Sequence, residues 1–322
     1  MAWSPTATAI MRRIVAEANT DILIFNAPIQ RNRDYRLLRK LEARICKPNL
    51  FMILVTGGGD ADAAYRIARF LQNRYERFTV CVPGFCKSAG TLIALGAHEL
   101  AFTENGEIGP LDIQLAKKDD LWGQESGLTV MTALTALHEN AQEAFDHFLL
   151  SLTTRSAGRI TVRTASEVAA KLTEALYSKI SEQIDPIHMG EVNRSMAIAQ
   201  KYGQRLMEKS KNYEEETLQA LISNYPSHGF VIDKEEACNL FKKVRDCTVD
   251  EVALLEDLSP FAVSPSTSPW VKFISDDIAE ENEANATAET ASVLEQPEVG
   301  GIVAQEGTDV PANGAAGIAT PA

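Results

Sequence analysis

Long apolar segments, a basic surplus and paired cysteines are all missing from this sequence. No window holds 18 uninterrupted apolar residues, which excludes a transmembrane helix. The first residues lack an apolar signal core, so we expect a cytoplasmic protein. The five cysteines form no C-x-x-C pair, and no zinc-binding motif is present. We therefore expect reduced, packed thiols, no metal and no other cofactor.

The acidic excess belongs mainly to the end of the chain. Acidic residues outnumber basic ones by 44 to 31 in the 322 residues, giving a net charge of −13. Residues 275–322 hold ten of the acids and no Lys or Arg, so the preceding residues are nearly neutral. Nucleic-acid binding or docking on anionic lipid requires a basic face, and we expect neither. Because residues 270–322 are rich in Ala, Glu, Gly and Pro, we predict a disordered acidic tail there.

The first 115 residues alternate segments with strand character and segments with helix character. Short apolar runs predict strands and helical spacing predicts the connections, with strands at 21–26, 50–55, 78–82 and 100–103 and helices at 6–18, 34–45, 60–75 and 88–97. This alternation predicts an α/β fold with parallel strands. Residues 127–211 have an almost entirely helical pattern. We predict a core over residues 1–126 and a helical extension over residues 127–250 that completes the fold.

A glycine run, Thr56-Gly-Gly-Gly-Asp60, lies between a predicted strand and a predicted helix. Nucleotide binding is disfavoured, because the third glycine of a G-x-G-x-x-G fingerprint is replaced by Asp62, and Asp60 and Asp62 would repel a phosphate. Two interpretations remain open. The run is either a tight turn without chemistry, or a turn that lets a backbone N–H approach a developing oxyanion.

A second turn carries Ser88, within the sequence P-G-F-C-K-S-A-G-T at residues 83–91. A serine that begins a helix is either a helix cap or a nucleophile. The segment is not the G-x-S-x-G elbow of α/β-hydrolases, because Cys86 stands two residues before the serine. Cys86 is itself a rival nucleophile, although no nearby histidine motif supports it and a packed thiol is favoured.

Five segments in this order resemble the Clp-protease/crotonase superfamily, and more narrowly the signal peptide peptidase A-like serine dehydrogenase proteinase family. They are the glycine turn, K-S-A-G-T-L-I-A-L at 87–95, G-P-L-D-I-Q at 109–114, D-P-I-H-M-G-E at 185–191 and Y-P-S-H-G-F-V-I at 225–232. The resemblance spans residues 21–244. It implies a ClpP/crotonase-like ββα-spiral core with a C-terminal helical extension, and a homo-oligomer.

The resemblance also implies site residues. Ser88 takes the nucleophile position, and the backbone N–H groups of Gly58 and Ala89 take the oxyanion-hole positions. In the Clp proteolytic subunits the base is a histidine, but Asp112 stands at that position here. The base is therefore unassigned, and the candidates for base or orienting group are Lys117, Lys118, His188, His228 and Asp112.

These observations predict a serine endopeptidase that hydrolyses peptide bonds of a peptide or protein substrate. Two alternatives stay open. The missing histidine at Asp112 is compatible with a non-catalytic scaffold on a peptidase fold. Crotonase-like acyl-CoA chemistry uses similar paired N–H groups, but no basic patch for the CoA phosphates is visible near Gly58 or Ser88.

Overall fold

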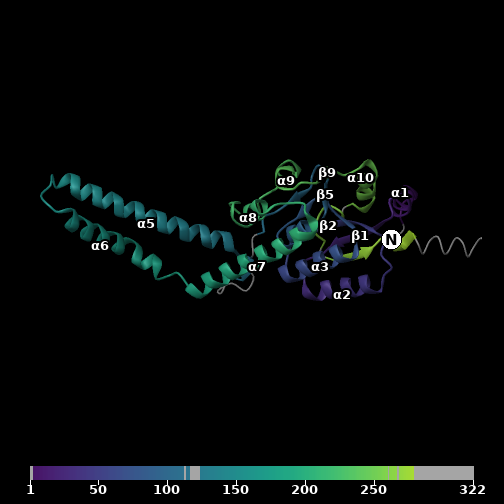
Figure 1. The fold of residues 1–322 in the computed structure, drawn as a ribbon, viewed down its shortest axis with the longest axis horizontal. Coiled ribbons are helices and arrows are strands. Elements are labelled where there is room, and N and C mark those ends of the chain that lie inside the picture. Colours follow the sequence, from purple (N-terminus) through teal and green to yellow (C-terminus); the bar gives the residue numbers. More distant parts are fainter. Residues whose placement is uncertain (1–2, 112–113, 117–123, 260, 267, 279–322) are drawn as a thin grey trace, which may run out of the picture. The chain divides into compact units, whose positions relative to one another are not determined.

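A six-stranded sheet with the strand order β10-β1-β2-β3-β5-β9 forms the centre of the fold (Figure 1). The computed structural model describes residues 3–111, 114–116, 124–259, 261–266 and 268–278. Five strands are mutually parallel and β10 runs antiparallel to β1. The strands are β1 (Thr20–Asn26), β2 (Asn49–Val55), β3 (Arg77–Val82), β5 (Glu99–Phe102), β9 (Val244–Asp246) and β10 (Trp270–Phe273).

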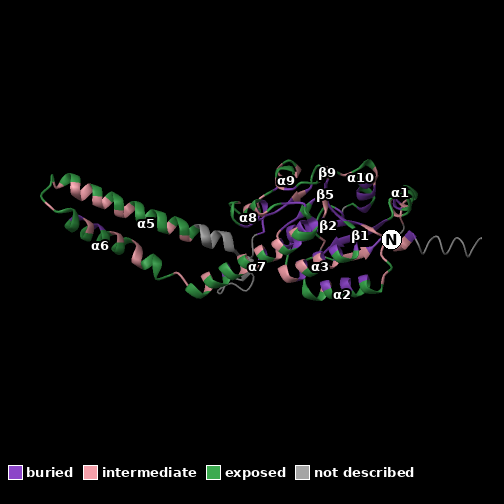
Figure 2. Ribbon diagram, viewed as in Figure 1, coloured by how far each residue is buried: buried purple, intermediate pink, exposed green. Residues whose placement is uncertain are grey.

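Helices cover both faces of this sheet, which explains why its strands read as continuous apolar runs (Figure 2). Leu23 and Phe25 of β1 belong to one buried cluster, while Ile22 and Ile24 belong to the other. The first cluster includes residues of α2 (Arg31–Ala43), α3 (Ala61–Arg74) and α4 (Ala89–Leu95), and the second includes residues of α1 (Pro5–Ala16) and α10 (Val249–Leu258). The strand and helix pattern predicted for the first half is thus confirmed.

A second, smaller layer of strand pairs follows the carboxyl ends of the parallel strands. Its β4 (Phe85–Cys86) pairs in parallel with β6 (Glu107–Ile108). Single bridges extend this layer, joining Ile29 to Gly59, Thr56 to Cys86 and Ile108 to Ile232. Each of the first strands therefore continues into a short second-layer segment before the next helix begins. This repeat is the predicted ββα spiral, and the fold class is confirmed.

The second half is helical, as its sequence pattern predicts. The helices are α5 (Gly127–Arg155), α6 (Val162–Ser181), α7 (Pro186–Ser210), α8 (Glu215–Ser223) and α9 (Lys234–Leu240), and a hairpin of β7 (Gln114–Ala116) and β8 (Gln124–Ser126) precedes them. Helix α5 packs against α6 and α7, and α7 packs in turn against α3 and α4. Within the described ranges, no helix has the length and apolar character needed to cross a membrane.

One expectation for the second half is wrong. The predicted disorder from residue 270 fails for residues 270–278, because Trp270–Phe273 forms β10 beside β1, and Ile274 and Ile278 are buried. The few large apolar residues at 270–278 do not change the average composition of residues 270–322, which is why the sequence predicted disorder there. Residues 279–322 lie outside the described residues. Residues 127–250, predicted as a helical extension that completes the fold, supply helices α5 to α9 and also the strand β9, which joins the main sheet beside β5.

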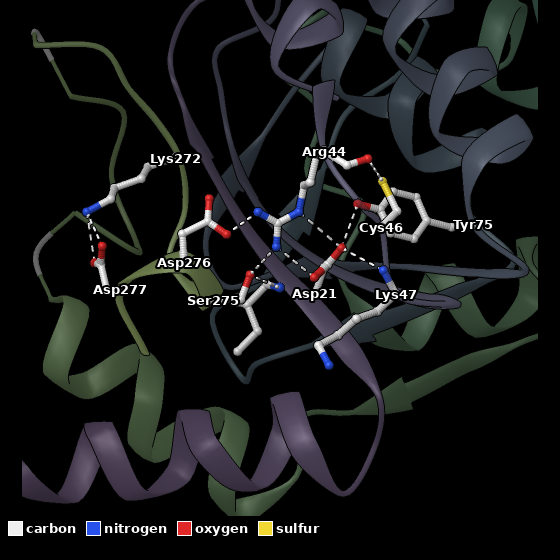
Figure 3. Close-up of polar contacts among 10 residues, drawn as sticks. Asp21, Arg44, Cys46, Lys47, Tyr75, Lys272, Ser275, Asp276 and Asp277 are labelled. Atoms are coloured by element: carbon white, nitrogen blue, oxygen red, sulfur yellow. Dashed lines mark hydrogen bonds and ion pairs between the residues drawn. The ribbon is translucent and has the colours of Figure 1, made fainter. Parts of the chain in front are cut away.

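A buried ion cluster anchors β10 to the amino ends of the strands (Figure 3). The Asp21 carboxylate is fully buried and accepts hydrogen bonds from Arg44 Nη2 at 2.8 Å, Tyr75 Oη at 3.0 Å and the Lys47 backbone N–H at 3.1 Å. Arg44 also pairs with Asp276, in the turn after β10. Burial, followed by hydrogen bonding to Cys46 and the charge of Asp21, raises the pKa of Tyr75. Asp21 is therefore a fully satisfied acceptor whose partners come from the segment between α2 and β2 and from the end of α3.

Removing one partner of this buried pair is expected to destabilise the protein strongly. The Arg44→Met variant leaves the Asp21 carboxylate buried with fewer donors, which costs about 3–5 kcal/mol of unfolding free energy. Urea unfolding followed by circular dichroism measures the loss. The matched control is Arg39→Met, because the Arg39–Glu42 pair is exposed and its loss should change stability by less than about 0.5 kcal/mol. Equal effects of the two substitutions would contradict a structural role for the cluster.

Candidate active site

Two turns at the carboxyl edge of the sheet are joined by backbone hydrogen bonds. The Thr56 N–H donates to the Phe85 carbonyl at 2.9 Å, and the Lys87 N–H donates to the Thr56 carbonyl at 3.0 Å. These bonds fix the glycine turn after β2 against the turn that carries Ser88. Asp60 is the N-cap of α3, because its Oδ1 accepts a hydrogen bond from the Ala63 N–H at 2.8 Å. The predicted meeting of the two turns is therefore observed.

Gly58 makes the closest approach to the serine. Its φ of +102° lies in a region that side-chain-bearing residues rarely adopt. A Cβ atom placed on Gly58 would lie 2.8 Å from the Ser88 Cβ, 3.0 Å from the Lys87 carbonyl oxygen and 3.3 Å from the Ala89 nitrogen. Only glycine fits here, for reasons of both conformation and space.

Ser88 has a strained backbone at the start of α4. Its φ of 53° and ψ of −115° are unusual for a residue with a side chain, and such conformations cost about 1–3 kcal/mol. Ser88 occupies the N-cap position, but its side chain makes no capping hydrogen bond to the first turn. The residue is partly exposed, whereas Ala89 and Gly90 beside it are buried. Ordinary helix capping therefore does not account for this serine.

The two backbone N–H groups considered for an oxyanion hole differ in their surroundings. The Ala89 nitrogen lies where the two turns meet, because a Cβ atom placed on Gly58 would be only 3.3 Å from it. The Gly58 N–H donates to Thr56 Oγ1 at 3.1 Å. For Gly58 to bind an oxyanion, its N–H has to share or exchange this hydroxyl partner. Thr56 is thus a site residue that the sequence pattern did not single out.

Cys86, the rival nucleophile, is a packed thiol in the structure. It is fully buried, and this burial raises its pKa to about 12, with Lys87 acting weakly in the opposite direction. Because a thiolate is the reactive form of cysteine, a thiol with this pKa stays protonated and unreactive near neutral pH. The expectation of a packed thiol agrees with this position.

Lys87, directly before the serine, is buried and fully engaged. Its Nζ lies 3.0 Å from Glu107 Oε1 and donates to the Ile108 carbonyl at 3.2 Å and the Phe230 carbonyl at 3.1 Å. A lysine ammonium has three N–H donors, so these three oxygens satisfy it. Lys87 thereby ties the turn that carries Ser88 to β6 and to residues 225–232. Sequence reasoning missed this role, although a single charge within the apolar run 82–97 was a signal.

Of the five candidate bases, His188 and His228 lie within the described residues. Asp112, Lys117 and Lys118 lie outside the described residues. His188 lies in the first turn of α7 and lines a cavity of about 490 Å³ together with residues of α5 and α6, none of which belongs to the Ser88 turn. His228 lies two residues before Phe230, whose carbonyl accepts from Lys87. The segment that carries His228 is therefore connected to the turn that carries Ser88.

Among the residues that the structure describes, no three His, Cys, Asp or Glu side chains gather into a set that could hold a metal ion.

Comparisons with known proteins point to the same part of the chain. The family model for the ClpP-like SDH-type serine proteinases matches residues 19–121, which include both turns, and points to a ClpP-like serine protease. Two uncharacterised proteins of Methanocaldococcus jannaschii are similar over short stretches. One is 37% identical over 81 residues, 25% of this chain and 28% of the relative, and the other is 38% identical over 66 residues, 20% and 23% respectively. The chain thus matches about a quarter of each relative.

Two solved structures of a membrane-bound stomatin-specific protease are also similar. Its serine-to-alanine mutant has a TM-score of 0.42 at 16% identity, covering 74% of this chain and 83% of that one. Its lysine-to-alanine mutant, in complex with a substrate peptide, has a TM-score of 0.42 at 15% identity, covering 78% and 85%. A likeness at this level assigns no role to any residue here. The family match over residues 19–121 confirms the resemblance that the sequence predicted.

Loss of the Lys87 ammonium is expected to loosen the segment that it holds. In a Lys87→Met variant the Phe230 and Ile108 carbonyls and the Glu107 carboxylate lose a shared donor, which should cost about 1–3 kcal/mol. Hydrogen exchange followed by mass spectrometry should show faster exchange in residues 225–232, while β1 and β2 stay protected. Lys179→Met is the control, since Lys179 pairs with an exposed glutamate three residues away. Unchanged exchange at 225–232 would contradict the anchoring role.

Proposed function

We propose that this chain, which resembles the ClpP-like SDH-type serine proteinases over residues 19–121, is a serine endopeptidase with Ser88 as its nucleophile. The observation that carries the proposal is the conformation of Ser88. It is strained, partly exposed, not used as a helix cap, and set against a glycine that no other residue can replace without a clash. Such strain persists where surrounding structure enforces it, typically at active sites.

The proposed reaction begins with attack of Ser88 Oγ on the carbonyl carbon of a peptide bond. The serine proton passes to a base, and the carbonyl oxygen becomes an oxyanion. The N–H groups of Ala89 and Gly58 are the proposed donors to this oxygen, with Gly58 giving up part of its bond to Thr56 Oγ1. The base then delivers the proton to the leaving amine, and water releases the acyl group from Ser88 in a second, equivalent step.

Lys87 is unsuited to act as the base, because its three donors are taken by Glu107, Ile108 and Phe230. The proposal therefore keeps the remaining candidates, with His228 supported by the connection of its segment to the nucleophile turn. Each remaining candidate is replaced by alanine in turn, and kcat is measured for each variant. The base is the position at which the substitution lowers kcat most. The candidates are Asp112, Lys117, Lys118, His188 and His228.

Neither alternative function is favoured by a particular observation. A non-catalytic scaffold gives no reason for a serine held at a φ of 53°. An acyl-CoA enzyme needs cations for the nucleotide phosphates. The nearest lysine in sequence, Lys87, is buried and paired. A peptidase accounts for more of the described geometry.

Ser88 is expected to be the residue that an active-site serine probe modifies. The Ser88→Ala variant removes the hydroxyl while leaving the turn and the Gly58 contact in place. Covalent labelling by a fluorophosphonate probe, which reacts with activated serines, is expected to disappear, together with peptide hydrolysis. Unchanged circular dichroism and unchanged thermal unfolding serve as the control for folding. Retained labelling in this variant would exclude Ser88 as the nucleophile.

Substitutions at the adjacent residues Gly57 and Gly58 separate the proposed oxyanion contact from general effects on the loop. Gly58→Ala forces a Cβ against the Ser88 Cβ at a position with a φ of +102°, so labelling should fall by about 100-fold or more. Gly57→Ala is the matched control, because its Cβ would meet only the Phe85 ring, at 3.8 Å, and its φ is not positive. Labelling rates that fall equally in both variants would contradict the proposed geometry.

A further inference from the structure

Thr91, in the first turn of α4 and three residues after Ser88, is bonded to the turn that follows β6. Its hydroxyl donates to the Gly109 carbonyl at 2.7 Å and accepts from the Gly109 N–H at 3.3 Å. Thr91 is fully buried, so this hydroxyl is held away from water. One side-chain hydroxyl thus provides Gly109 with both a donor and an acceptor, as a neighbouring strand would.

Gly109 approaches the start of α4 from a second side as well. A Cβ atom placed on Gly109 would lie 2.7 Å from Lys87 Cδ, so the glycine lies against the apolar stem of this lysine. The turn after β6 is therefore held by the residue before Ser88 and by the residue three positions after it. These two contacts determine how far Gly109 lies from the helix that Ser88 begins.

The residue pair Ile108–Gly109 is also where other segments of the resemblance meet. Ile108 and Ile232 exchange backbone hydrogen bonds of 3.0 Å in both directions, and Ile232 ends the segment 225–232. The sequence G-P-L-D-I-Q begins at Gly109 itself. Three of the five segments that carry the family resemblance, those at 87–95, 109–114 and 225–232, therefore join at this junction.

Four of the five candidate bases belong to the two segments that meet α4 here. They are Asp112, Lys117, Lys118 and His228. The first three follow Gly109 by at most nine residues, and the fourth precedes Ile232 by four. A base must come within about 2.6–3.2 Å of the serine hydroxyl, and a misplacement of about 1 Å can lower a rate about 100-fold. The placement of the junction against α4 therefore bears on proton transfer to any of the four.

We propose that Thr91 is a positioning residue, whose hydroxyl holds the Ile108–Gly109 junction at the distance from Ser88 that proton transfer requires. The inference rests on the proposed peptidase function, and it holds for whichever of the four candidates is the base. Because Thr91 is buried, it acts through Gly109 and not on the substrate. The proposal gives a role to the threonine of K-S-A-G-T, which the reaction itself does not use.

Removal of the Thr91 hydroxyl should slow the reaction without weakening substrate binding. Thr91→Val keeps the volume of the side chain and removes both hydrogen bonds, so the rate of Ser88 labelling by a fluorophosphonate probe should fall about 10- to 100-fold. In hydrolysis of fluorescein-labelled casein, the loss should appear in kcat, with KM changed less than about threefold. Thr91→Ser keeps the hydroxyl and should restore most of both rates.

Thr217→Val is the matched control. Thr217 is also a buried threonine, and its hydroxyl donates to the Leu240 carbonyl at 2.7 Å, between α8 and α9. Both valine variants should lower the thermal unfolding temperature to a similar extent, but only Thr91→Val should slow labelling and hydrolysis. If Thr91→Val does not fold, Thr91→Ala removes the same hydroxyl without placing a methyl group against Gly109.

The outcomes separate this inference from the proposed nucleophile. Equal labelling rates in Thr91→Val and Thr217→Val would overturn the positioning role, as would a Thr91→Ser variant that is as slow as Thr91→Val. Loss of labelling in Ser88→Ala together with normal labelling in Thr91→Val contradicts the role of Thr91 alone. Retained labelling in Ser88→Ala removes the nucleophile and this inference together.

Discussion

The contact between Gly58 and the Ser88 side chain sets the geometry of the whole candidate site. Because Gly58 has no side chain, the turn after β2 can lie directly against the serine and the Ala89 nitrogen. A side chain at this point would have to push the two turns apart, and Gly58 would then no longer lie against Ser88 and the Ala89 nitrogen. The geometry of the site therefore requires glycine at position 58 as well as serine at position 88.

This contact is maintained by the second layer of strand pairs. The bridge between Thr56 and Cys86 and the pairing of β4 with β6 hold the turns through backbone hydrogen bonds, which do not depend on side-chain identity. Lys87 adds a buried charge that reaches β6 and the segment around Phe230. The strained conformation of Ser88 can persist because several independent bonds surround it.

The sequence predicted the parts of this structure that local patterns determine. Continuous apolar runs gave β1, β2 and β3, since both faces of these strands are covered, and the glycine and serine turns follow directly from them. Edge strands β9 and β10 were missed because each has only three or four residues, several of them charged, and gains its stability from a neighbour distant in sequence. The role of Lys87 was missed for the same reason, as its partners Glu107 and Phe230 are far along the chain.

The two edges of the sheet have different physical characters, and this difference connects stability to the proposed function. At the amino edge, Asp21 and Arg44 form a buried and fully paired cluster, and Arg245 links Glu99, at the start of β5, to Glu251. At the carboxyl edge lies the strained serine, in a turn held mainly by backbone bonds. Open α/β sheets commonly bind ligands at the carboxyl ends of their strands. Because the two edges are separated by the length of the strands, strong ion pairing at one edge can stabilise the fold without placing competing charges beside the nucleophile. The polar contacts of Asp21 therefore stabilise the sheet, whereas those of Lys87 and Thr56 fix the turns around Ser88.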